Sequence, residues 1–90
     1  MGLRQHFRFT YSTLSDVQAF LRSFNQSVNV EDQDEFFAFT QLEGTSPFTF
    51  DCEIVPSGLL SERAGSYFTF LGQFVEATTG RFGPVEISDL

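Results

Sequence analysis

The chain has 90 residues, 12 of them acidic and 5 basic, so its formal net charge is −7 at pH 7. This length predicts a single domain over residues 1–90, and the charge opposes binding to nucleic-acid phosphates or to an anionic membrane surface. The single cysteine excludes an internal disulfide, and the N-terminal residues lack the apolar core of a signal peptide, which together predict a cytoplasmic protein.

The first elements in chain order are a strand and a helix. Residues 6–11 alternate, with Phe7, Phe9 and Tyr11 on one side, which is the pattern of a half-buried strand. Thr13 and Asp16 then form an acidic variant of the capping box, and apolar residues follow at helical spacing. We therefore expect a helix that begins at Thr13 and ends within residues 25–29.

An acidic connector over residues 31–35 leads into two further strands. Residues 36–42 read as one strand and residues 48–55 as the next, with turn residues between them. The alternation over 48–55 is the clearest in the chain and sends Thr49, Asp51 and Glu53 outward. These two strands are expected to form a hairpin, which residues 56–58 close.

A second helix and a short strand complete the chain. Apolar residues from Tyr67 to Val75 form one helical stripe, so we expect a helix that starts at Ser61 or Ser66 and stops at Gly80. The alternative is a second hairpin over 67–78 that turns at Gly72 and Gln73, and the helix is favoured because the stripe continues past Gly72. Residues 84–88 then predict a last strand.

This order of elements, β-α-β-β-α-β, is that of the ferredoxin-like arrangement. The sequence therefore predicts an α+β fold with a four-stranded antiparallel sheet of order 4-1-3-2 and two helices on one face. The opposite face of the sheet is expected to be open.

Catalytic and metal-binding chemistry finds little support in the sequence. His6 and Cys52 fall on opposite strand faces, and the acidic connector lacks the glycine and the distal glutamate of a calcium loop. Asp51 and Glu53 have a carboxylate spacing of about 6.6 to 7 Å along a strand, but a flat sheet offers no cleft for a substrate. We expect no catalytic residue, no cofactor and no metal, so the chain is not predicted to be an enzyme.

RNA-recognition domains share the predicted order of elements and stack bases on aromatic residues of the open face. The corresponding positions here offer no stacking platform, and two of them are carboxylates: His6, Arg8, Thr10, Thr49, Asp51 and Glu53. Nucleic acid is therefore not an expected partner.

The strand over residues 36–42 carries large apolar side chains on both faces, so its register is ambiguous. In one register Phe37 and Phe39 are exposed, and in the other Phe36 and Leu42 are. We take the first register and predict a protein-binding site in which Phe37 and Phe39 are apolar anchors. Its acidic rim comprises Asp32, Asp34, Glu35, Asp51, Glu53 and Glu86.

The function expected from these features is binding to a basic protein. A small acidic protein of the inhibitor or immunity type, which caps a basic surface such as the active site of a nuclease, has this combination of charge and exposed aromatic residues. The alternative is a homodimeric ferredoxin-like module, regulatory or binding a small ligand, in which the open sheet faces pack against each other.

Overall fold

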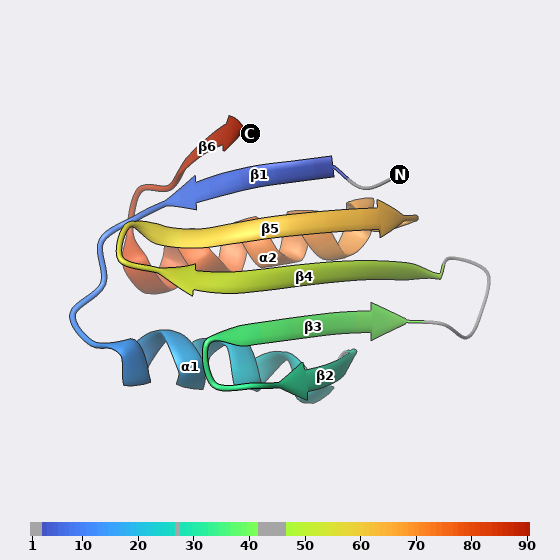
Figure 1. The fold of residues 1–90 in the computed structure, drawn as a ribbon, viewed down its shortest axis with the longest axis horizontal. Helices are drawn as coiled ribbons and strands as arrows, with labels where there is room; N and C mark the ends of the chain where they lie inside the picture. Colours follow the sequence, from blue (N-terminus) through green and yellow to red (C-terminus); the bar gives the residue numbers. More distant parts are fainter. Residues whose placement is uncertain (1–2, 27, 42–46) are drawn as a thin grey trace.

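The computed structural model describes residues 3–26, 28–41 and 47–90. In this part of the chain, six strands form one antiparallel sheet in the order β2-β3-β4-β5-β1-β6, and both α-helices lie behind it (Figure 1). In chain order the elements are β1 (Leu3–Arg8), α1 (Leu14–Arg22), the 3-10 helix η1 (Ser23–Gln26), β2 (Asn29–Asp32), β3 (Phe36–Gln41), β4 (Phe48–Val55), β5 (Gly58–Gly65), α2 (Phe68–Phe82) and β6 (Glu86–Asp89).

The expected four-stranded ferredoxin-like sheet is therefore wrong. Strands β2 to β5 follow one another as a meander, and β1 lies between β5 and β6. The mixed α+β class holds, but the sheet is larger by the two strands β2 and β5. The expected strands over 36–42, 48–55 and 84–88 correspond to β3, β4 and β6, and the strand expected over 6–11 ends earlier, at Arg8.

Strand β5 escaped prediction because its core-facing side chains are mostly polar. Leu59, Ser61 and Arg63 all point toward the helices, with exposures of 0%, 3% and 2%. An inward row of Leu, Ser and Arg does not give the apolar alternation that marks a strand. The pattern instead predicts a turn that ends at Gly58 and a helix that starts at Ser61 or Ser66.

Strand β2 lies within the segment that was expected to be a helix end and an acidic connector. Val30 is opposite Phe39 of β3, and Asp32 is opposite Phe37. Asp32 points to the helix side, where its carboxylate accepts a hydrogen bond from the Nε of Arg22 in α1. An inward-facing charge on a short edge strand interrupts the apolar alternation, so the sequence pattern does not predict this strand.

The start of α1 agrees with the sequence. Thr13 has an extended backbone, with φ −138°, and its Oγ1 accepts a hydrogen bond from the backbone N–H of Asp16 at 3.2 Å. This is the expected N-cap geometry.

The segment after β5 forms helix α2 rather than a second hairpin, and it continues past Gly80 to Phe82. Gly83 ends it with φ 89°, a conformation that favours glycine, and donates to the carbonyl of Thr79 at 2.9 Å. No helix among the described residues is long and apolar enough to cross a membrane.

The core lies between the sheet and the two helices and is built mainly from phenylalanine. The ring of Phe74 in α2 is at its centre, with centroid distances of 5.9 Å to Phe7, 5.0 Å to Phe50 and 6.1 Å to Phe20. These rings bridge β1, β4, α1 and α2 in one cluster. Because the core occupies one face of the sheet, the other face carries the outward-pointing side chains.

Candidate functional site

The face of the sheet opposite the helices carries the candidate site. Alternation along β4 buries its apolar residues toward the helices, so Asp51 and Glu53 point to the open side. The antiparallel register places Glu31 of β2 and Glu62 of β5 on the same side. These four carboxylates form what is called the acidic face below: Glu31, Asp51, Glu53 and Glu62.

Three of the four carboxylates lie in one row across the strands. Asp51 is directly opposite Glu62 of β5 and, on its other side, opposite Ala38 of β3. Ala38 is in turn opposite Glu31 of β2. Directly opposed residues have Cβ atoms about 4.5 to 5.5 Å apart. Asp51 therefore has one carboxylate as its immediate neighbour and a second one beyond the short side chain of Ala38.

This row perturbs the titration of its central member. Partial burial, followed by the negative charges of Glu62 and Glu31, raises the pKa of Asp51 above its ordinary value. A raised carboxyl pKa means that folding disfavours the ionised form. The ionised form of Asp51 is therefore less favourable in the folded protein than in the unfolded chain.

A shallow hollow of about 90 Å³ lies within the acidic face. Phe36 is one of its apolar walls and has 39% of its surface exposed. The hollow is lined by Arg4, Phe36, Asp51, Glu53, Leu60, Ser61, Glu62 and Leu90. Apolar and acidic side chains thus meet at one small depression.

Basic residues of β1 occupy the neighbouring part of the same sheet face. Arg4 is opposite Glu62 in the strand register. Arg8 lies four residues further along β1, and its Nη1 is 3.6 Å from the Oε1 of Glu86 in an exposed ion pair. The open face is therefore acidic over β2, β4 and β5 and basic over β1.

Phe37 and Phe39 do not belong to this face, because both side chains are fully buried. The ring of Phe39 lies 5.6 Å from that of Phe24 and 5.5 Å from that of Phe70, both on the helix side. Their predicted exposure as anchors is wrong, since β3 takes the other of the two registers considered. Phe36 is the aromatic residue that β3 presents on the open side, and Leu42 lies outside the described residues.

Four of the predicted rim residues fall in two places. Asp51 and Glu53 are on the acidic face, whereas Asp32 and Asp34 contact Arg22 of α1, the latter with 3.8 Å between Oδ1 and Nη2. The hydrogen bond between Arg22 and Asp32 lowers the pKa of Asp32 and raises the pKa of Arg22. Arg22 thus neutralises this part of the connector.

Two further predicted rim residues lie near the ends of strands. Glu35 is exposed in the β2–β3 turn, and its backbone N–H donates to the carbonyl of Gln33 at 2.8 Å. Glu86 begins β6, where it pairs with Arg8. Neither residue is among those that line the hollow.

Sequence reasoning missed Glu31 and Glu62 because they lie on the two unpredicted strands. The available signal was the turn at Pro56 and Ser57, which joins β4 directly to a second strand of the same length. With that hairpin recognised, Leu60 and Glu62 follow as outward residues of β5.

Arg63 is a third residue that the sequence did not single out. It is 2% exposed, and its Nη2 donates to the Oε1 of Gln5. Its guanidinium carbon lies 5.8, 5.6 and 4.9 Å from the ring centroids of Phe7, Phe50 and Tyr67. Its Nε and Nη1 have no hydrogen-bond partner among the described residues. Arg63 lies on the helix side of the sheet and is not part of the acidic face.

The structure keeps the histidine and the cysteine apart, as expected. Cys52 is fully buried, and burial raises the pKa of its thiol. His6 is on the open side, with its Nε2 2.8 Å from the Oγ of Ser57. Across the described ranges, no three His, Cys, Asp or Glu side chains are grouped so that they could hold one metal ion.

Comparison of the chain with protein-family models, with curated proteins and with solved structures gives no match. Its function is therefore inferred from the geometry of the open sheet face.

Proposed function

We propose that the chain is a protein-binding module whose acidic face covers a basic surface of a partner protein. The observation that carries this proposal is the direct opposition of Asp51 and Glu62 on neighbouring strands, with Glu31 in the same row. Like charges placed directly opposite each other destabilise a sheet. A cationic partner removes this repulsion when it binds, so the arrangement favours the complex over the free protein.

The hollow supports a Lys or Arg side chain as the anchor that the partner inserts. At about 90 Å³, it has roughly the volume of three water molecules and admits one side chain rather than a folded segment. Phe36 and Leu60 offer apolar surface to the methylene stem, and the neighbouring carboxylates accept hydrogen bonds from the charged head. An Arg anchor suits the paired carboxylates of Asp51 and Glu62 because its forked donors can serve both.

The charge of the whole chain supports the same partner class. A net charge of −7 attracts a basic protein over several ångströms beyond contact and speeds the encounter. Salt weakens this attraction, so the complex is expected to lose affinity as ionic strength rises. An inhibitor or immunity protein that caps the basic groove of an enzyme such as a nuclease is a function of this kind.

The experiment compares two isosteric substitutions that remove the same charge. After affinity capture and identification, the purified partner is titrated by calorimetry against the wild type, Glu62→Gln and Glu76→Gln. Glu76 is an exposed acid of α2, away from the acidic face. We expect Glu62→Gln to weaken binding by about tenfold or more and Glu76→Gln to leave it within about twofold. Equal effects of the two substitutions, or an acidic partner, would contradict the proposal.

Self-association is a second candidate, and the distribution of charge on the open face favours it. β1 presents Arg4 and Arg8 beside the acidic face. In two copies related by a twofold axis, the acidic half of one open face can therefore contact the basic half of the other. Light scattering separates the two candidates. Self-association predicts twice the 10.2 kDa mass of the chain at low salt, whereas the basic-partner proposal predicts a monomer.

A further inference from the structure

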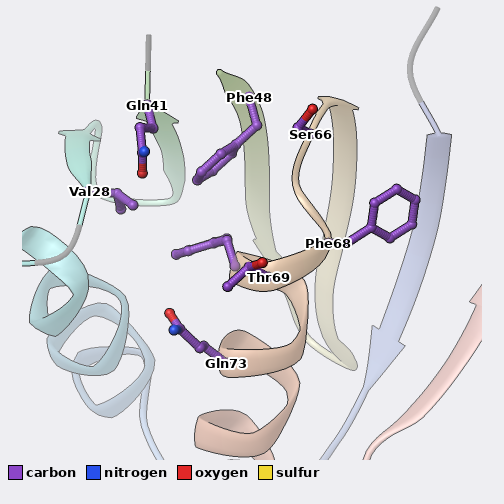
Figure 2. Close-up of a pocket in the computed structure, with 8 residues that line it drawn as sticks. Val28, Gln41, Phe48, Ser66, Phe68, Thr69 and Gln73 are labelled. Carbon is purple, nitrogen blue, oxygen red and sulfur yellow. The ribbon is translucent and has the colours of Figure 1, made fainter. Parts of the chain in front are cut away.

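A cavity of about 580 Å³ lies on the helix side of the molecule, separate from the acidic face. It opens where the adjacent ends of β3 and β4 meet the first turns of α2 (Figure 2). Its lining includes Gln41, Phe48, Ser66, Thr69, Phe70 and Gln73. The volume falls within the range of about 300 to 1,000 Å³ that is typical of small-molecule sites.

The floor of the cavity is apolar and already packed. Phe48 and Phe70 are stacked with a centroid distance of 5.2 Å and an interplanar angle of 25°. They are 6% and 4% exposed, so only a small part of each ring reaches the cavity, and this part is held in place by the surrounding core. Figure 2 shows the ring of Phe68 directed away from Gln41 and Gln73.

Uncharged polar side chains surround this floor. The carboxamides of Gln41 and Gln73 come from the end of β3 and the second turn of α2, and Figure 2 shows both directed into the space between these elements. The hydroxyl groups of Ser66 and Thr69 add further donors and acceptors. All four residues are exposed, so their polar atoms are accessible to a ligand.

The charge of the lining restricts the class of ligand. The described residues that line the cavity are all uncharged, although the chain as a whole carries −7. An ion moved into the cavity would leave water without meeting a counter-charge on these side chains, which is unfavourable. A neutral molecule avoids this cost, and a carboxamide on it can both donate to and accept from the two glutamines.

We propose that this cavity binds a small neutral molecule with a flat aromatic ring and a carboxamide-like edge. The ring contacts the accessible parts of Phe48 and Phe70, and the polar edge bonds to Gln41 and Gln73. This site is independent of the protein-binding function proposed for the acidic face.

The test uses three probes of nearly the same shape and different charge: benzamide, benzoate and benzamidine. Each is titrated into the isotopically labelled protein, and two-dimensional NMR spectra follow the amide signals. We expect benzamide to shift the side-chain amides of Gln41 and Gln73 and the backbone amides of Thr69 and Phe70. Benzoate and benzamidine should leave these signals in place at the same concentration. Equal shifts with all three probes, or no shift with benzamide, would overturn the proposal.

Two variants check that the glutamine contact is real. Gln73→Ala is expected to weaken benzamide binding by about 2- to 10-fold, the effect of losing one hydrogen bond. Gln33→Ala, in the β2–β3 turn, is the matched control and should bind benzamide as the wild type does. Unchanged binding by Gln73→Ala would refute the assignment. Benzamidine is a cation, so shifts that it causes only at Asp51, Glu53 and Glu62 would support the acidic face as a cation-binding surface. The same result would agree with a cavity that takes neutral ligands, and the two proposals can therefore fail separately.

Discussion

Phe36 and Phe37 are neighbours in the chain but lie on opposite faces of β3, and truncating each one tests how the whole strand is placed. Phe37 has no exposed surface, whereas Phe36 is 39% exposed. Removing a fully buried phenylalanine ring costs about 3 to 5 kcal/mol, because apolar contacts are lost and a cavity remains. Removing a partly exposed ring on an open face is expected to cost about 1 kcal/mol or less.

The expected loss for Phe37→Ala is large compared with the stability of so small a domain. At about 0.05 to 0.15 kcal/mol per residue, a chain of this length has a free energy of unfolding of about 5 to 13 kcal/mol. Phe37→Ala therefore removes a quarter of it or more and can prevent folding altogether. Phe37→Leu keeps most of the apolar volume and provides a folded variant with a smaller loss.

Urea denaturation followed by circular dichroism measures these differences as shifts of the midpoint at constant slope. We expect the order of stability to be wild type, Phe36→Ala, Phe37→Leu and Phe37→Ala. If Phe36→Ala were the more destabilising of the two alanine variants, β3 would have the opposite register. Phe37 and Phe39 would then face the open side, and Phe36 could not be a wall of the hollow.

Three further substitutions or reactions test other parts of the structure. Asp51→Asn relieves the repulsion by Glu62 and should raise the free energy of unfolding by about 0.5 to 1 kcal/mol, while Glu76→Gln leaves it unchanged. Because folding raises the pKa of Asp51, its stabilising contribution is complete below the unfolded pKa and is lost as pH rises through the folded one. The advantage of Asp51→Asn should therefore grow with pH in a denaturation series between about pH 3 and 7, and an advantage that shrinks would contradict this. Arg63→Met replaces an incompletely paired guanidinium and should raise the free energy of unfolding, measured in urea, by about 1 to 3 kcal/mol. A clearly lower free energy of unfolding would mean that the contacts of Arg63 with the aromatic rings stabilise the protein by more than the cost of burying its charge. The thiol of Cys52 should react with an aromatic disulfide reagent only as fast as the protein opens, and reaction at the rate of an exposed thiol would place it outside the core.

The elements that the sequence predicted well are those whose local signals agree with their burial. In β4 the core-facing residues are all apolar and the outward ones polar or only partly buried, so alternation alone identifies the strand and its faces. The N-cap at Thr13 is a local interaction and was likewise readable. Asp51 and Glu53 were assigned to the open face because they lie on this strand.

The errors arose where tertiary contacts override the local pattern. Arg63 is accommodated in the core by aromatic rings from β1, β4 and the segment before α2, which no window around residue 63 reveals. Asp32 faces inward because Arg22 of α1 pairs with it. In β3, Phe36 and Phe37 give both faces a large ring, so the register depends on the packing of η1 and α2 against Phe39. Because β2 and β5 were not predicted, the sequence could not show that Glu31, Asp51 and Glu62 form one row across the strands.

The acidic face as a docking surface is tested most directly by mapping where a cationic probe binds. The labelled protein is titrated with an octa-arginine peptide at low and at high salt, and the amide shifts are compared between the wild type and the Asp51→Asn/Glu62→Gln double variant. We predict the largest shifts around Asp51, Glu53 and Glu62 in the wild type, with a marked loss in the double variant and at high salt. Shifts that are equally large around Glu76, or that persist in the double variant, would contradict the acidic face as the docking surface.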